Sequence, residues 1–231
     1  MAFRLWALVP LLIGIVATVV SVWLGTEYFK LVKPFFHVAL FSFYWASTKK
    51  FNLIVLLFLA TTMVAEFLAA TDFMEYLVPI MLLFTAYFAI GTYLQYPILK
   101  ATKTTKLRTI DIWAGLGGIF LLVYIILTVF VVSVKEIEAF TLFSIATLVF
   151  SAFIATAFYI AGFHKHPKKI FIFIVGVCYV IICSGSLIYE LQFPSVYLLG
   201  LVNLSEVIAQ MSFIFFMIYR DELLQQKTWL I

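Results

Sequence analysis

The stretch SVYLLGLVNLSEVIAQMSFIFFMIY, residues 195–219, decides the fold class of this chain. A transmembrane α-helix needs roughly 20 mostly apolar residues, and this stretch exceeds that length with Glu206 as its one charged residue. Strands of a membrane β-barrel are shorter and alternate apolar with polar residues, which this stretch does not do. Seven more such runs are found at about 5–25, 31–47, 52–71, 74–97, 112–134, 139–162 and 170–192. The sequence therefore predicts an all-α, polytopic membrane bundle of about eight transmembrane helices.

The composition supports the same class of protein. Hydrophobic residues make up 65% of the 231 residues and charged residues only 11%, with a mean hydropathy of +1.16. Soluble domains are roughly 45–50% apolar and about 25% charged, so a soluble globule is excluded. No stretch is long and polar enough for a second domain, and residues 1–231 are expected to form a single transmembrane domain. The net charge of +4 does not indicate nucleic-acid binding, because the basic residues lie in short loops between apolar runs.

The loop charges predict the orientation of the helices, because cytoplasmic loops of membrane proteins are enriched in Lys and Arg. Three basic residues, Lys30, Lys33 and Lys135, lie on the side that holds most of the acids. The others lie on the opposite side: Arg4, Lys49, Lys50, Lys100, Lys103, Lys106, Arg108, Lys165, Lys168, Lys169, Arg220 and Lys227. We therefore expect an N-in/C-in topology with both termini cytoplasmic, in a bacterial inner membrane.

Two predicted spans carry carboxylates away from their ends, where an acid is costly inside a membrane and therefore marks a candidate site. In the last span Asn203, Glu206 and Gln210 are spaced i, i+3 and i+7, so they share one helix face near mid-bilayer. In the third span Thr62 and Glu66 are four residues apart. Glu66 and Glu206 are the candidate catalytic residues, and a glutamate that only hydrogen-bonds between helices is the structural alternative.

The second span supplies possible partners for these carboxylates, because Lys33, His37 and Tyr44 follow one of its faces. With the predicted topology, Lys33, His37, Glu66 and Glu190 fall in the outer half of the membrane, and Glu206 lies near the middle. We expect a polar cavity that is lined by spans two, three, seven and eight and opens outward. The candidate substrate-binding residues are Lys33, His37, Tyr44, Asn203 and Gln210.

Other kinds of site find little support in the sequence. There is no Cys/His metal spacing, no phosphate-binding glycine loop and no serine elbow, and we expect no metal and no cofactor. Cys178 and Cys183 are expected to be buried and inert. His164 and His166 lie in a lysine-containing loop and are expected to be solvated.

Two short motifs carry a family resemblance. Lys33-Pro34 begins the second span, which runs on to Tyr44, and the third span contains Ala65-Glu66. These motifs resemble the second and third spans of the YhhN family. Members of this family are membrane enzymes with eight spans that hydrolyse the vinyl-ether bond of lysoplasmalogens. The family has Gly-Asp where this chain has Ala-Glu.

The last span is similar to the family's Tyr-x-x-Ala-Gln pattern, with Glu206 in the place of the tyrosine before Ala209-Gln210. The resemblance implies a hydrolase that acts on ether lysophospholipids. The family's seventh-span Ser-Asp reads Ser184-Gly185 here. This difference favours the alternative, a non-enzymatic ligand-binding, sensing or transport protein on the same scaffold.

The chemistry that the resemblance implies needs a proton donor. Vinyl-ether hydrolysis delivers a proton to the enol carbon and then adds water to the oxocarbenium ion, which suits a carboxylic acid. Glu66 or Glu206 would supply the proton, and the other carboxylate would position water or stabilise the cation. Lys33 would bind a lipid phosphate. The expected partners are membrane lipids, with a lysophospholipid substrate or another hydrophobic ligand.

Overall fold

The computed structural model describes residues 2–102, 120, 123–124, 127 and 137–225. Within these residues the chain forms α-helices, one 3-10 helix (η1, Pro167–Lys169) and no strand. The helices are α1 (Ala2–Trp23), α2 (Thr26–Thr48), α3 (Leu53–Asp72), α4 (Leu77–Ala101), α6 (Ile137–Phe163), α7 (Ile170–Leu191), α8 (Val196–Ile218) and α9 (Arg220–Leu224). The predicted all-α bundle is confirmed for this part of the chain.

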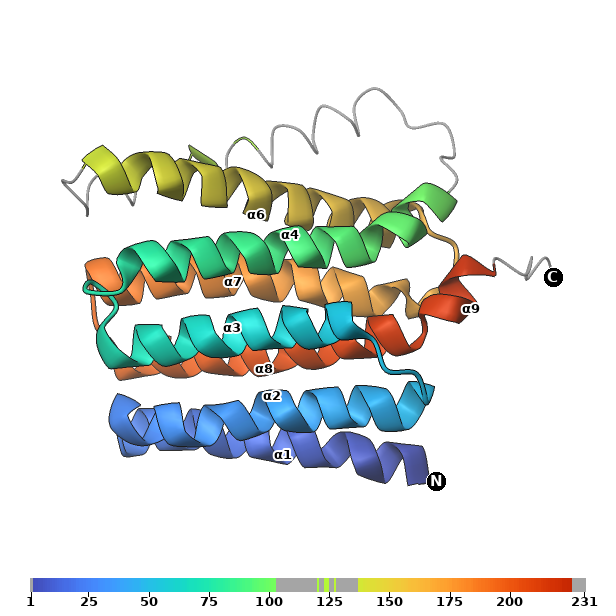
Figure 1. The fold of residues 1–231 in the computed structure, drawn as a ribbon, viewed down its shortest axis with the longest axis horizontal. Helices are drawn as coiled ribbons and strands as arrows, with labels where there is room; N and C mark the ends of the chain where they lie inside the picture. The colour runs from blue at the N-terminus through green and yellow to red at the C-terminus, as the bar shows by residue number, and fades with distance from the viewer. Residues whose placement is uncertain (1, 103–119, 121–122, 125–126, 128–136, 226–231) are drawn as a thin grey trace.

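The seven long helices form a closed ring. Each contacts the next in chain order among the described helices, and α8 contacts α1, which closes the bundle. α2 and α8 also contact each other. Figure 1 shows the helices side by side, with the α3–α4 and α7–α8 turns at the left end and α9 and the start of α1 at the right end. We call these the turn end and the terminal end.

Six described helices are long and apolar enough to cross a membrane, which makes the chain an integral membrane protein. Their spans are Trp6–Trp23, Leu53–Asp72, Leu77–Ala101, Thr141–Phe163, Pro167–Glu190 and Val196–Ile218. The second predicted span forms α2, which is 23 residues long but less apolar because it carries Lys33 and His37. The fifth predicted span, 112–134, lies almost entirely outside the described residues. The orientation across the membrane stays a prediction.

Local sequence sets where α3 begins and ends. The Asn52 side chain accepts hydrogen bonds from the backbone N–H groups of Ile54 (3.0 Å) and Val55 (3.4 Å), which caps the first turn. At the other end Asp72 Oδ1 accepts a hydrogen bond from the N–H of Glu75 at 2.9 Å and tightens the turn into α4. Together these contacts fix the register of α3 and hence the position of Glu66.

α8 is the most buried of the spanning helices. In α8, 72% of the span is buried inside the bundle, against 22% in α1. Helix α1 packs closely on it at Gly14, where an added Cβ would lie 2.7 Å from the Val207 side chain. Polar residues on α8 therefore point into protein rather than lipid, which is the only way such residues are tolerated at this depth.

The expectation that His164 is solvated is wrong, because only 2% of its surface is exposed. Its Nε2 lies 3.1 Å from the carbonyl oxygen of Leu223, and its Nδ1 accepts a hydrogen bond from the N–H of His166 at 3.2 Å. The short helix α9 folds back against the bundle, so Leu223 covers the imidazole. A loop composition rich in lysine gave no sign of this cover.

Candidate functional site

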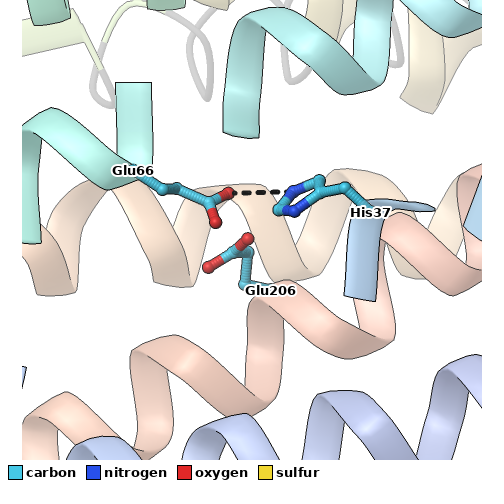
Figure 2. Close-up of side chains that lie close together, drawn as sticks. All are labelled: His37, Glu66 and Glu206. Atoms are coloured by element: carbon cyan, nitrogen blue, oxygen red, sulfur yellow. Dashed lines mark ion pairs between the residues drawn. The ribbon is translucent and has the colours of Figure 1, made fainter. Parts of the chain in front are cut away.

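Three helices bring ionisable side chains together inside the ring. Lys33 and His37 come from α2, Glu66 from α3 and Glu206 from α8. We call these four residues the carboxylate cluster. Figure 2 shows the Glu66 and Glu206 carboxylates side by side, with the His37 ring directed at Glu66. Contacts of this kind between three helices agree with the predicted grouping of these residues.

The Lys33 ammonium holds the two carboxylates together. Its Nζ donates a hydrogen bond to Glu206 Oε2 at 2.7 Å and lies 3.4 Å from Glu66 Oε2. The lysine side chain is only 4% exposed. A buried ion pair repays its desolvation only with good geometry and further hydrogen bonds.

Gln210 and Thr62 supply those further hydrogen bonds. The Gln210 amide donates to Glu206 Oε1 at 2.7 Å and to Glu66 Oε1 at 3.2 Å, so it bridges the two carboxylates. The Thr62 hydroxyl donates to the same Glu66 oxygen at 2.8 Å. The predicted i+4 spacings on α3 and α8 thus place each helper one turn from its glutamate.

The hydrogen bonds of His37 decide where a proton lies. Its Nδ1 is 3.2 Å from the backbone carbonyl oxygen of Lys33, and because a carbonyl only accepts, Nδ1 must carry a hydrogen. Its Nε2 is 3.5 Å from Glu66 Oε1 and makes no hydrogen bond with a described residue. This contact is favourable only when a proton sits on Nε2 or on the Glu66 carboxyl.

Charge balance leads to the same conclusion. Burying a net charge costs several kcal/mol, so the cluster is most stable with equal positive and negative charge. Lys33 balances Glu206. One proton shared by His37 and Glu66 makes that second pair neutral overall, whether the proton lies on nitrogen or on oxygen. A proton shared by these two groups would therefore move between them without changing the net charge of the cluster.

A cavity of about 200 Å³ lies beside the carboxylates. Glu66, Glu206 and Gln210 form its polar floor, while aromatic side chains such as Phe88 and Phe150 form much of its wall. The lining continues past Ser186 and Asn203 to Glu190 and Leu199, near the turn end of the bundle. All seven helices of the ring contribute to it, so the structure adds α1, α4 and α6 to the four predicted spans.

The predicted binding residues fall in different places. Gln210 lies in the floor, and Asn203 lines the cavity and donates a hydrogen bond to Ser21 at 2.7 Å. Lys33 and His37 lie behind the carboxylates and are not among the residues that line the cavity. Tyr44, seven residues beyond His37 on α2, is buried but also does not line it.

A pair of tyrosines in the cavity wall was not predicted from the sequence. The hydroxyls of Tyr87 on α4 and Tyr179 on α7 are hydrogen-bonded to each other, and both residues line the cavity. The two positions are 92 residues apart, and no local spacing links them. Only the closed ring of helices brings them together.

Part of the cluster also has the geometry of a metal site. One ligand atom each of His37, Glu66 and Glu206 lie within 4.8 Å of one another, and such imidazole and carboxylate groups bind divalent cations. The Lys33 ammonium already contacts both carboxylates. A metal ion would have to displace this ammonium group. The lysine therefore supplies the positive charge that a metal ion would supply to the two carboxylates.

Fold and site together define a polytopic helical membrane protein with a buried histidine–glutamate cluster beside an internal cavity. No family model, no curated protein sequence and no solved structure matches the chain. The function therefore has to be argued from the site.

Proposed function

We propose that this protein is a membrane hydrolase that cleaves an ether lysophospholipid by general acid–base chemistry at the carboxylate cluster. The observation that carries the proposal is the contact of His37 Nε2 with Glu66 Oε1 at 3.5 Å, which places an imidazole beside a carboxylate that lines the cavity. The resemblance to lysoplasmalogenases supports a vinyl ether as the bond that is cleaved. The loop charges support a cavity that opens toward the outer side of the membrane.

Glu66 is the proton donor in this proposal. It lines the cavity while His37 lies behind it, so the shared proton reaches a bound substrate only through the carboxyl group. The carboxyl protonates the vinyl carbon that is not bonded to oxygen, and positive charge develops on the vinyl carbon that is bonded to oxygen. A positioned acid of this kind accelerates a reaction by about 10²–10⁴-fold.

Glu206 stabilises the cation that forms. Its carboxylate stays ionised beside Lys33 and also lines the cavity. Water then adds to the oxocarbenium carbon and returns a proton to the Glu66–His37 pair. The hemiacetal breaks into an aldehyde and the free hydroxyl of the headgroup fragment, and the cluster regains its starting charge. Preorganised charges in a site with little water are effective at this kind of stabilisation.

The cavity shape suits an amphiphile. Its floor is polar and its wall is largely aromatic and aliphatic, so a chain would lie against the wall with the reactive bond at the floor. Among the described lining residues there is no Lys or Arg. A phosphate group is therefore expected at the cavity mouth, and Lys33 acts on the carboxylates instead of on the phosphate.

The test offers the purified protein vinyl-ether, alkyl-ether and acyl lysophospholipids, with fatty aldehyde and free acid detected by mass spectrometry. Aldehyde is expected from the vinyl ether, with a loss of about 10²–10⁴-fold in Glu66→Gln. Asp72→Asn is the matched control, because Asp72 ends the same helix and the amide oxygen can still cap Glu75. Equal activity in the wild type and Glu66→Gln would rule out the assigned donor.

A second candidate is a non-catalytic protein that binds a hydrophobic ligand. It is favoured by the internal compensation of the cluster, in which Lys33 already pairs with both carboxylates. The same assay separates the two functions. A lipid that co-purifies unchanged, with no product from any of the three substrates, would favour binding or transport over hydrolysis.

A further inference from the structure

The Tyr87–Tyr179 pair is a polar feature of the cavity that the proposed mechanism leaves without a role. Tyr87 is 1% exposed and Tyr179 is 3% exposed, and their hydroxyls meet between α4 and α7. Both residues line the cavity together with Glu66 and Glu206. They therefore face the same occupant as the carboxylates.

Counting hydrogens shows that the pair has a donor to spare. Each phenol can donate one hydrogen bond and also accept, so two hydroxyls that bond to each other use only one of their two hydrogens. Neither hydroxyl makes another hydrogen bond to a described residue. A buried donor without an acceptor is destabilising, so the second hydrogen calls for an acceptor inside the cavity.

The surroundings define the charge of that acceptor. The Tyr87 ring stacks on Phe58 with centroids 4.2 Å apart, and the Tyr179 ring packs edge-on against Phe88 and Phe153. An anion would lose its hydration here, and the described lining residues include no Lys or Arg to compensate it. An uncharged oxygen avoids this cost.

We propose that the Tyr87–Tyr179 hydroxyl pair binds the uncharged oxygen that links the chain of the bound amphiphile to its headgroup. The inference rests on the proposed function, because it takes an ether-linked amphiphile as the occupant. It adds a specificity device: an ether oxygen accepts the spare hydrogen, and a plain hydrocarbon at the same place leaves it unpaired.

The test is a binding cycle with two non-hydrolysable probes. One is an alkyl-ether lysophospholipid and the other is its analogue with CH₂ in place of the linking oxygen. The wild type is expected to bind the ether about threefold to tenfold more tightly, as one neutral hydrogen bond provides. The double variant Tyr87→Phe/Tyr179→Phe is expected to lose this preference while it binds the CH₂ analogue at least as tightly as the wild type does.

Two controls protect this result. The double variant removes both hydroxyls and leaves no buried donor unpaired, so it is expected to melt close to the wild type. Tyr93→Phe changes an exposed tyrosine on the same helix, 63% exposed, and should keep the full ether preference. Should the double variant fail to fold, the wild type alone decides the inference, because equal affinities for the ether and for its CH₂ analogue would contradict it.

Three outcomes would overturn the inference: an ether preference that survives in the double variant, an equal loss of affinity for both probes, or no binding of either probe to the wild type. The outcome is separate from that of the hydrolysis assay. Loss of the preference with no vinyl-ether turnover would support the hydroxyl pair and reject the hydrolase. Turnover with an unchanged preference would do the reverse.

Discussion

His37 and His164 are equally buried, each with 2% of its surface exposed, yet their partners differ. Both nitrogens of His164 face backbone groups, the carbonyl of Leu223 and the N–H of His166. His37 has one nitrogen on a backbone carbonyl and the other beside the Glu66 carboxylate without a hydrogen bond to a described residue. The comparison teaches that burial alone does not mark a reactive histidine. What distinguishes His37 is an unsatisfied nitrogen next to an acid.

The largest effect is expected from Lys33→Met, which leaves two buried carboxylates without their cation. Removing one partner of a buried ion pair typically lowers the free energy of unfolding by about 3–5 kcal/mol. Thermal melting of the purified protein in detergent measures it. The added change Glu206→Gln should restore part of the loss, because it removes one of the uncompensated charges.

Lys30→Met is the matched control for this variant. Lys30 lies on the same helix and pairs with Glu27, whose side chain is 72% exposed. Such surface pairs contribute little, because water and salt screen them. If both lysine variants melted alike, the cluster would not be the electrostatic centre of the bundle.

The next effect separates the two histidines by activity. His37→Gln removes the partner that shares a proton with Glu66, and we expect turnover of the vinyl ether to fall by about 10²-fold or more. The melting temperature should change little, since an amide fills a similar volume and can bond to Glu66. A variant with normal turnover would show that Glu66 receives its proton from elsewhere.

Sequence alone predicted much of the fold and part of the site, for physical reasons that differ. Hydrophobic run lengths located the spans, because each helix must satisfy its own backbone in lipid. Helical spacing placed Glu206 and Gln210 on one face, and depth singled out Glu66 and Glu206. These are properties of single helices, which a sequence contains directly.

What the sequence missed depends on contacts between helices that are distant in the chain. The Tyr87–Tyr179 pair and the cover of Leu223 over His164 span 92 and 59 residues. No periodicity encodes such a distance. The predicted position of Lys33 on the outer side suggested the carboxylates as its partners, but only the ring geometry shows that it lies behind them and not in the cavity.

His164→Phe is expected to give a moderate loss of stability with unchanged turnover per folded molecule. The substitution leaves the Leu223 carbonyl and the His166 N–H without their partner, and unsatisfied buried groups cost about 1–3 kcal/mol each. Melting in detergent measures the loss, and the hydrolysis assay confirms that the site is intact. A fall in turnover as large as that of His37→Gln would remove the distinction between the two histidines.

The pH dependence of melting sharpens the same prediction. Burial lowers the pKa of His164 below its ordinary value of 6.5, and the charges of nearby His166 and Lys169 act in the same direction. The unfolded chain then binds the proton more readily, so the folded state loses stability as the pH falls below about 6.5. In His164→Phe this part of the acid sensitivity should be absent.

The smallest effect is expected from Lys50→Ala at the same end of the bundle. Lys50 Nζ lies 2.9 Å from Asp221 Oδ2 and joins the segment between α2 and α3 to α9, the helix that also carries Leu223. Both side chains are largely exposed, so salt screens the pair and ordering it costs side-chain entropy. Melting at physiological salt should match the wild type. A loss as large as that of His164→Phe would mean that surface charge, and not the buried imidazole, holds α9 against the bundle.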